Sequence, residues 1–367
     1  AHAGILHRAR GKTGARYLRK RGVLKLPGRL TAETFLARHW QKKPLFMPGA
    51  VAGMTPSVTR NELAWLATLD DVESRIVFTW RTDKQTRCHA ETGPFEEAFL
   101  RALPNRDWTL LVHDVEKHLP AMRKLFNYVP FVPDWRIDDL MISFAAPGGG
   151  VGPHRDNYDV FLCQGIGLRE WRYTTGPVDE DPLASDDLAL LQEFHDGEHH
   201  ITRKGDVLYL PPGVAHWGTA QRACLTYSIG MRAPDFYADP DLKLHEIRPG
   251  YLSPEAKIRA ANDAPSLGRL VTELKDWLRP YAPEDEEIAA LMKAPGSLRK
   301  LKLHGMTRIA YDDENLYVNG TVQAADNRTV SLVAELCARR RLSSALVNDL
   351  EPECLRWLLA QGAFELP

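Results

Sequence analysis

Two histidines and one aspartate in this sequence have the residue types and spacing of a metal site. His154 and Asp156 form a His-x-Asp pair just after the glycine run 148–150, and His216 lies sixty-two residues after His154, in the segment PPGVAHWG. Residues i and i+2 of an extended segment project from the same side, so both side chains can reach one ion. Two imidazoles and one carboxylate, with no fourth protein ligand evident, suit non-haem Fe(II) and leave positions open to a cosubstrate and O2. We therefore expect His154, Asp156 and His216 to bind Fe(II).

Most of the 13 histidines in the chain need no such role. A histidine chosen at random is most often found at the surface or in a hydrogen bond. His195, His199 and His200 also cluster, but they lie in an acidic, loop-like stretch. We expect these three to face solvent.

Arg169 is a candidate for binding a carboxylate. It follows His154 by fifteen residues and lies in the strand-like segment LREWRY, which would neighbour the ligand strand in a barrel. A guanidinium group forms a planar fork that can hold a carboxylate through two hydrogen bonds. The alternative is a surface arginine paired with Glu170 or with an acid from residues 179–198. The predicted metal ligands nearby favour the carboxylate-binding role.

Length and composition predict a soluble globular protein with a sizeable core. The chain has 367 residues, of which 44% are hydrophobic. No run approaches the roughly 18 uncharged apolar residues of a membrane span, and the beginning of the chain lacks the apolar core of a secretory signal. The five cysteines are scattered, odd in number and never in CxxC spacing, which favours reduced thiols in a cytoplasmic protein.

Charge is unevenly distributed along the chain, although the net charge is only −1. Residues 1–25 carry eight Lys or Arg and no acid, whereas residues 179–198 carry eight Asp or Glu and no Lys or Arg. A basic arm can bind RNA or another polyanion, but a flexible, solvated terminus is the simpler interpretation. The acidic run could steer a basic partner toward a nearby site or form an exposed loop, and the sequence leaves both open.

The elements that precede the candidate site are helices followed by strands. A capped helix is expected from Thr31 to Pro44, and a second helix is expected to begin at Ser57 or Thr59. Segments rich in β-branched and aromatic residues then predict strands at 74–80 and 108–115.

The residues of the candidate site lie in a region of short apolar runs, from 136 to 232. These runs are separated by Gly, Pro and Asp turns every eight to fifteen residues, a rhythm that is typical of an antiparallel barrel or jelly roll. Alternate residues of such a strand share a face, so Asp139, Met141 and Ser143 should point the same way. The sequence therefore predicts an α+β protein whose site lies in a β-barrel cavity.

The remainder of the chain has a different pattern. Residues 235–292 carry apolar residues at helical spacing and are broken by prolines, which predicts short helices with an apolar face that must pack on another surface; a partner subunit is one candidate. From about residue 296 strand-like segments form a hairpin and an Asn-Gly turn at 319–320, and helices follow at 328–340 and 351–361. Helices with a β-wing in about 70 residues resemble a winged helix, a fold used mostly for nucleic-acid or protein contacts.

Three segments together resemble one known family. They are RIDDLMISFAAPGGGVGPHRDNYDVFLCQGIGLREWR, GDVLYLPPGVAHWG and YSIGMRAP. They closely resemble the bacterial JmjC-type ribosomal oxygenases, which are Fe(II)- and 2-oxoglutarate-dependent hydroxylases of an arginine in large-ribosomal-subunit protein sixteen. The similarity extends from about Leu26 to the end of the chain and is strongest over 136–234.

The resemblance implies a domain organisation. It implies a double-stranded β-helix (cupin or JmjC jelly roll) as the catalytic domain over 26–234, a helical dimerisation segment over 235–292 and a winged-helix domain over 293–367. Residues 1–25, the basic arm, fall outside it. The implied assembly is a homodimer with a ribosomal protein as substrate and no membrane partner, and nucleic-acid contact through the winged helix is left open.

The resemblance also assigns roles to individual residues. It makes His154, Asp156 and His216 the iron ligands and Arg169 the partner of the 2-oxoglutarate C5 carboxylate, with O2 as the further substrate. Thr226 stands where some relatives have Asn near the cosubstrate. The substrate-arginine pocket maps onto Asp139, Met141, Tyr158 and Ser228. Met141 and Tyr158 are equally compatible with an ordinary barrel core, whereas an acid on an apolar strand needs a cationic or hydrogen-bonding partner.

Three other functions remain open from the sequence. The same machinery could hydroxylate a histidyl residue or demethylate a methyl-lysyl residue, because an acid at 139 favours a cation without separating Arg from Lys. A cupin-like metalloenzyme that uses no oxygen is the second. The third is a binding protein whose winged helix contacts nucleic acid while the barrel serves as a scaffold.

Overall fold

A computed structural model describes residues 24–51, 54, 57–81, 86–132, 137–178, 183–185, 190–191, 193–195, 197–231, 272, 282–311 and 314–366. The chain divides into two compact units, one of residues 21–233 and 243–252, the other of residues 1–20, 234–242 and 253–367. The predicted basic arm, except for its last two residues, lies outside the described residues. So does the predicted helical segment 235–292 before residue 282, except for Thr272.

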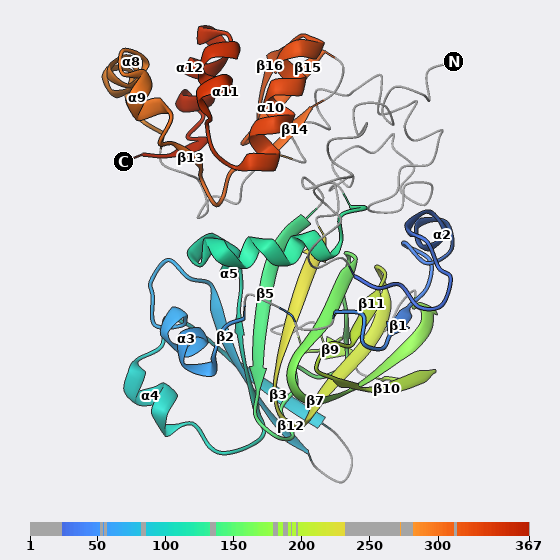
Figure 1. Ribbon diagram of the computed structural model, residues 1–367. Coiled ribbons are helices and arrows are strands. Elements are labelled where there is room, and N and C mark those ends of the chain that lie inside the picture. The colour runs from blue at the N-terminus through green and yellow to red at the C-terminus, as the bar shows by residue number, and fades with distance from the viewer. Residues whose placement is uncertain are drawn as a thin grey trace. The chain divides into compact units, whose positions relative to one another are not determined.

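The first unit begins with helices and strands that alternate along the chain (Figure 1). They are α2 (Ala32–Arg38), β1 (Leu45–Met47), α3 (Arg60–Leu66), β2 (Ser74–Arg81), β3 (Thr86–Thr92), α4 (Glu97–Ala102), β4 (Trp108–Val112), α5 (Val115–His118) and the 3-10 helix η1 (Pro120–Tyr128).

Local sequence signals explain where the first two helices begin. The Thr31 side chain accepts a hydrogen bond from the Thr34 backbone N–H at 3.2 Å, and Thr59 forms a reciprocal capping box with Glu62. The first helix ends at Arg38, before the predicted stop at Pro44. Gln41 shortly after it has a φ of 58°, a left-handed conformation that an α-helix cannot continue through.

These strands and those that follow them in the chain build one curved antiparallel sheet (Figure 1). Its order is β1-β11-β7-β12-β5-β4-β2-β3, with β10 also paired to β7 and β6 to β12. The later strands of this sheet are β5 (Ile137–Ala145), β6 (His154–Arg155), β7 (Val160–Pro177), β10 (Glu198–Arg203), β11 (Val207–Leu210) and β12 (Val214–Met231). A small separate pair consists of β8 (Leu183–Ser185) and β9 (Leu190–Leu191). The predicted antiparallel β region is therefore confirmed.

Two eighteen-residue strands, β7 and β12, form the centre of this sheet. Their pairing has register shifts between Val214 and His216, between Ala220 and Leu225, and between Leu225 and Thr226. Such irregularities bend a strand and increase its twist, so one strand can contribute to both ends of a curled sheet. β12 pairs with β6 at its beginning and with β5 at its end, and in this way it links the predicted ligands to the predicted substrate residues.

Both faces of the sheet are covered. Phe161 and Cys163 of β7 belong to the main hydrophobic core, whereas Val160 and Leu162, on the opposite face, belong to a second cluster with Trp171 and other inward side chains. This alternation follows from the two-residue period of a strand. On the outer face Phe35 of α2 packs edge-on against Tyr209 with ring centroids 5.0 Å apart. The candidate site shares the inner face with this second cluster, because the Trp171 ring lies 5.9 Å from that of His216.

The second unit combines short helices with small sheets. Its elements are α8 (Asp285–Met292), α9 (Pro295–Leu298), β13 (Lys302–Leu303), β14 (Ile309–Tyr311), β15 (Asn315–Val318), β16 (Thr321–Ala324), α10 (Asn327–Arg339), α11 (Ser344–Asp349), α12 (Pro352–Ala360) and β17 (Phe364–Glu365). The predicted Asn319-Gly320 turn is confirmed, since both residues have positive φ and connect β15 to β16. The short helix α11 was not predicted. None of the helices in the described parts of the chain is long and apolar enough to cross a membrane.

Candidate metal centre and carboxylate pocket

The three predicted metal ligands lie together on the inner face of the sheet. One ligand atom from each of His154, Asp156 and His216 lies within 4.8 Å of the others, and no other His, Cys, Asp or Glu group in the described part of the chain has this arrangement. His216 of β12 is the cross-strand partner of His154 of β6, and their ring centroids are 4.2 Å apart. Asp156 Oδ2 lies 3.6 Å from His216 Nε2. The spacing that suggested a metal site therefore corresponds to a real cluster.

Backbone carbonyls determine which nitrogen of each histidine faces the cluster. Nδ1 of His154 lies 3.0 Å from the Gly152 carbonyl oxygen, and Nδ1 of His216 lies 3.0 Å from that of Val214. These acceptors take the Nδ1 hydrogen, and in a neutral ring the lone pair is then on Nε2. Gly152 has a φ of 79°, a conformation that favours glycine, and this turn directs its carbonyl to His154. Hydrogen bonds of this kind orient metal-binding histidines.

Burial keeps His216 neutral. Its side chain is 3% exposed, and burial, together with the neighbouring His154, lowers its pKa to about 4. A histidine binds a metal only when it is deprotonated, so His216 has its lone pair free at neutral pH. The Asp156 backbone carbonyl accepts a hydrogen bond from the Gly213 N–H at 2.8 Å, which ties the two ligand segments together.

Arg169 is buried without a carboxylate partner. It is 3% exposed, and its Nη1 lies 3.2 Å from Ser143 Oγ and 3.5 Å from Thr226 Oγ1. Its Nη2 lies 3.4 Å from the Gly218 carbonyl oxygen, and its Nε has no hydrogen-bond partner. Among the described residues no acid pairs with this guanidinium group. Buried charges are normally paired, so the site has the donors and the charge to bind a carboxylate.

The alternative of a surface arginine paired with Glu170 is wrong. Glu170 lies 3.5 Å from Arg172 and accepts a hydrogen bond from Gln221 at 2.8 Å, on the exposed side of β7. Arg169 points to the opposite side of the strand, as the two-residue period requires.

Gly218 makes room for the arginine, which was not foreseen from the sequence. Gly218 of β12 pairs with Trp171 of β7, and the Arg169 guanidinium carbon lies 4.7 Å from the centre of the Trp171 ring. A Cβ at position 218 would lie 2.6 Å from both Arg169 Nε and the Trp171 ring. Gly218, the second glycine in PPGVAHWG, is thus needed for the stack of Arg169 on Trp171.

The predicted substrate residues lie at neighbouring positions of β5 and β12. Met141 pairs with Ser228, and Asp139 pairs with Gly230. A Cβ at Gly230 would lie 2.8 Å from Asp139 Oδ1 and 3.9 Å from the Tyr158 ring, so Asp139 and Tyr158 share the space above this glycine. Gly230 is a second glycine whose role the sequence alone did not reveal.

Acidic groups surround Tyr158. The nearby charge of Asp156, followed by burial and the charge of Asp139, raises the pKa of the Tyr158 hydroxyl well above its usual value. Tyr158 keeps a 40% exposed side chain, so the acidic surroundings are accessible from solvent. A negative, partly aromatic site of this kind favours a cationic ligand.

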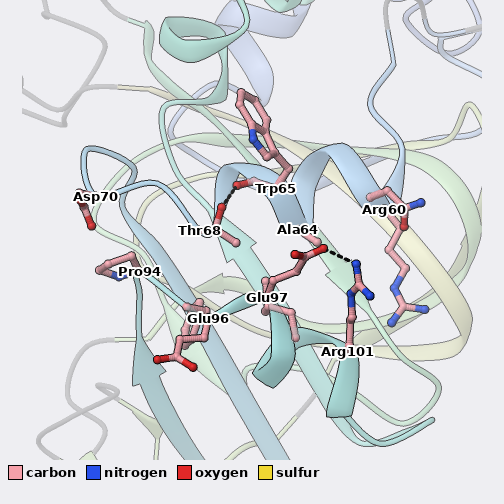
Figure 2. Close-up of a pocket in the computed structure, with 12 residues that line it drawn as sticks. Arg60, Ala64, Trp65, Thr68, Asp70, Pro94, Glu96, Glu97 and Arg101 are labelled. Carbon is pink, nitrogen blue, oxygen red and sulfur yellow. Dashed lines mark hydrogen bonds and ion pairs between the residues drawn. The ribbon is translucent and has the colours of Figure 1, made fainter.

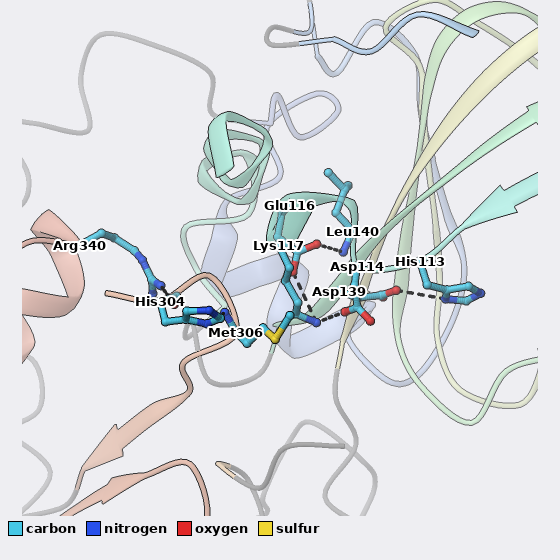
Figure 3. A network of polar contacts seen from close by, with 9 residues as sticks. All are labelled: His113, Asp114, Glu116, Lys117, Asp139, Leu140, His304, Met306 and Arg340. Carbon is cyan, nitrogen blue, oxygen red and sulfur yellow. Dashed lines mark hydrogen bonds and ion pairs between the residues drawn. The ribbon is translucent and has the colours of Figure 1, made fainter. Parts of the chain in front are cut away.

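Asp139 is part of a polar network that the sequence did not predict (Figure 3). His113 Nδ1 lies 3.3 Å from Asp139 Oδ2, and the Leu140 backbone N–H donates to Glu116 Oε2 at 3.0 Å. Glu116 is 1% exposed, and burial, together with the charge of Asp139, raises its pKa to about 7. The segment HDVEKH directly after a buried strand was the only sequence signal for this network.

The histidines outside the cluster are placed differently. His195 and His199 are exposed, as predicted. His199 and His200 lie in strand β10, so the expected loop is wrong there, and His200 is only partly exposed because it stacks on Phe46 with ring centroids 4.2 Å apart. A cavity of about 910 Å³ lies between α3 and α4 (Figure 2), and none of its lining residues belongs to the predicted site.

The comparison with known families identifies the class of domain. Residues 124–238 match the JmjC domain family, and this range contains all three predicted metal ligands. The match covers most of the cupin-like antiparallel core of the first unit, so this core is similar to a JmjC domain.

Two curated relatives resemble the chain more specifically. It is 39% identical over 201 residues to the ribosomal protein uL16 3-hydroxylase of Escherichia coli, and 35% identical over 240 residues to a probable ribosomal oxygenase of Haemophilus influenzae. The matches cover 55% and 60% of this chain and 52% and 57% of those proteins, so the chain matches about half the length of its curated relatives. The resemblance to ribosomal oxygenases is confirmed.

Solved structures of YcfD from Escherichia coli have the same fold. An X-ray structure of that protein gives a TM-score of 0.73 at 28% identity and covers 94% of this chain and 100% of that one. A structure of YcfD described as a ribosomal oxygenase in complex with cobalt and 2-oxoglutarate gives a TM-score of 0.69 at 28% identity, with coverage of 94% and 99%.

Proposed function

We propose that this protein is an Fe(II)/2-oxoglutarate-dependent oxygenase that hydroxylates an arginyl residue of a large-subunit ribosomal protein. The observation that carries the proposal is the position of the buried, unpaired Arg169 close to the cluster of His154, Asp156 and His216. The relatives named as a uL16 3-hydroxylase and as a ribosomal oxygenase with cobalt and 2-oxoglutarate support it.

The proposed metal ligands fit a ferrous ion. His154 and His216 would bind it through Nε2, because their Nδ1 atoms are occupied by backbone carbonyls, and Asp156 would supply one carboxylate oxygen. Bound Fe(II) would supply the activation of O2 coupled to the conversion of 2-oxoglutarate to succinate and CO2. Three protein ligands leave further positions for these reagents.

Arg169 would hold the far carboxylate of 2-oxoglutarate. Its Nε has no partner, and its contacts to Gly218 and Thr226 are long, so a bidentate carboxylate would complete its hydrogen bonds. Ser143 and Thr226 would line the same end of the pocket. Burial of the guanidinium group excludes water and strengthens its attraction to the carboxylate.

Asp139, Met141, Tyr158 and Ser228 would bind the substrate side chain. The Asp139 carboxylate and the Ser228 hydroxyl would accept guanidinium hydrogens, while Met141 and the Tyr158 ring would contact its stem and plane. Binding the terminal nitrogens in this way would leave a carbon earlier in the side chain facing the metal. The contribution of these residues is positioning.

The other parts of the chain would support this activity. We assign residues 26–234 to the catalytic domain, 235–292 to a helical dimerisation segment and 293–367 to a winged-helix domain, in a cytoplasmic homodimer. The three-stranded sheet β14-β15-β16 followed by α10, α11 and α12 is compatible with a winged helix.

Substrate-coupled succinate release tests the proposal against its alternatives. The protein, reconstituted with Fe(II) and 2-oxoglutarate, should release succinate faster when the ribosomal protein is added, and His154→Ala should abolish the release. A cupin metalloenzyme that uses no oxygen would release none. Stimulation by a histidyl or methyl-lysyl peptide instead of the arginyl one would transfer the assignment to one of those substrates.

A further inference from the structure

Gln164 is a buried polar residue on the strand that carries Arg169. It lies on β7, is 1% exposed, and pairs across the sheet with Thr226. Its side-chain nitrogen donates to the carbonyl oxygens of Ile166 at 2.7 Å and Leu225 at 3.1 Å. Because only the NH2 end of an amide can donate, these two carbonyls fix which end of Gln164 faces which way.

The oxygen of Gln164 is therefore directed at two threonine hydroxyls. Thr226 Oγ1 donates to Gln164 Oε1 at 3.2 Å, and Thr202 Oγ1 lies 3.1 Å from the same oxygen. A hydroxyl group has a single proton, so a Thr226 proton donated to Gln164 leaves only lone pairs on its other side. Arg169 Nη1 lies on that side, 3.5 Å from Thr226 Oγ1.

Thr202 connects the same amide to the backbone of Arg169. Its hydroxyl lies 3.0 Å from the Arg169 carbonyl oxygen as well as 3.1 Å from Gln164 Oε1. The single proton of the Thr202 hydroxyl can be donated to only one of these two oxygens at a time, so the hydrogen-bonded link from Gln164 to the Arg169 guanidinium group runs through Thr226. The groups of this link are buried, where hydrogen bonds are strong and a missing partner is costly.

We propose that Gln164 is a positioning residue for the cosubstrate: it sets the Thr226 hydroxyl as an acceptor for Arg169 and so holds the guanidinium group for the carboxylate of 2-oxoglutarate. This inference rests on the proposed function of Arg169. The neutrality of the amide matters as much as its hydrogen bonds. A carboxylate at position 164 would supply a counter-ion within the protein and compete with the one that the cosubstrate brings.

A merely structural role predicts something different. Gln164 lies opposite the register shift between Leu225 and Thr226 of β12. In a purely structural role, its amide would do no more than supply the hydrogen bond to the Leu225 carbonyl oxygen at this irregularity. Its replacement would then lower the stability of the fold without a specific effect on the cosubstrate. It would also act independently of the Thr226 hydroxyl.

The first test measures binding of 2-oxoglutarate to the full chain loaded with Mn(II), by isothermal titration calorimetry. Gln164→Glu should weaken 2-oxoglutarate binding about tenfold or more while Mn(II) affinity stays within about twofold of the unmodified protein. Gln221→Glu is the matched control, since Gln221 is exposed on the neighbouring strand and contacts Glu170 rather than Arg169. Equal 2-oxoglutarate affinity for Gln164→Glu and the control would overturn the proposal.

The second test is a double-mutant cycle, which remains informative if one variant is less stable. Gln164→Leu and Thr226→Val should each weaken 2-oxoglutarate binding, and the double variant should be little worse than either alone, because Gln164 acts through Thr226. Multiplicative effects in the double variant would overturn the proposal.

Failure of this inference can be told apart from failure of the proposed function. If the unmodified protein binds Mn(II) but not 2-oxoglutarate, the function of the pocket is wrong, and the inference falls with it. If the unmodified protein binds 2-oxoglutarate and all Gln164 variants bind it equally well, only the role of Gln164 is wrong.

Discussion

His216 Nε2 lies 3.6 Å from Asp156 Oδ2, although the two residues belong to segments about sixty positions apart in the chain. This distance is too long for a hydrogen bond, and the pKa of about 4 keeps His216 neutral at pH 7. The pair is therefore not an ion pair that holds the sheet together. Two lone-pair donors directed at the same point are what a metal ion requires.

Removing the carboxylate should abolish tight metal binding. Asp156→Ala is expected to weaken Mn(II) or Co(II) binding at least a hundredfold, because one of three ligands is lost. Calorimetric titration of the metal-free protein measures this directly. Glu193→Ala serves as the control, since Glu193 is exposed and lies 3.7 Å from the surface His195. Unchanged affinity in Asp156→Ala would contradict the assignment of the ligands.

Arg169 and Arg172 provide a matched pair on one strand. Arg169→Ala should weaken 2-oxoglutarate binding about a hundredfold or more, because a buried charge-assisted contact is lost. Arg172→Ala should leave it nearly unchanged, since Arg172 is about half exposed and interacts with Glu170. Titration of both Mn(II)-loaded variants with 2-oxoglutarate makes the comparison. Similar affinities in the two variants would argue against Arg169 as the anchor.

Replacing Asp139 should weaken binding of the substrate and leave binding of the cosubstrate unchanged. Asp139→Asn is expected to raise the KM for the ribosomal substrate about tenfold to a hundredfold, because a charge that pairs with a guanidinium group is removed. Binding of 2-oxoglutarate should stay the same. Glu97→Gln is the control, since Glu97 is exposed on α4 and pairs with Arg101. A change in 2-oxoglutarate affinity without a change in the KM for the ribosomal substrate would show that Asp139 contacts the cosubstrate instead of the substrate, and would contradict the assignment.

The buried Glu116 should make stability depend on pH. Its pKa is about 7 in the folded protein, whereas an exposed glutamate has a pKa of about 4.3. Between these pH values the unfolded chain releases this proton and the folded one keeps it. The Glu116 contribution to the free energy of unfolding therefore falls as pH rises from about 4.3 to about 7.

Glu116→Gln removes this titration and can still accept the hydrogen bond from the Leu140 N–H. Relative to the unmodified protein, the variant should gain about 2 kcal/mol in the free energy of unfolding between pH 5 and pH 8. Urea unfolding at the two pH values measures this gain. A difference between the two proteins that is the same at both pH values would show that Glu116 does not titrate in this range.

The metal cluster and the antiparallel core could be predicted because they depend on local patterns. The His-x-Asp spacing places His154 and Asp156 on the same face of an extended segment. The turn in PPGVAHWG allows a later strand to place His216 beside them. Alternation along 137–145 likewise predicted the common face of Asp139, Met141 and Ser143, which pair with Gly230, Ser228 and Thr226.

Contacts between distant segments could not be predicted. The need for glycine at 218 and 230 arises only where a second strand places Trp171 or Asp139 opposite. The links from Gln164 to Thr202 and Thr226 depend on strand register, which no single segment encodes. His200 was misplaced because its packing on Phe46 comes from β1, more than a hundred residues earlier in the chain.

Tandem mass spectrometry of the ribosomal protein tests the central claim most directly. The protein, anaerobically loaded with Fe(II) and 2-oxoglutarate, is mixed with the intact large-subunit protein homologous to uL16 and then exposed to air. The addition of one oxygen atom to a carbon of a single arginyl side chain, absent with His154→Ala, is the predicted result. Oxygen added only to a histidyl residue, or no product while succinate is still released, would contradict it.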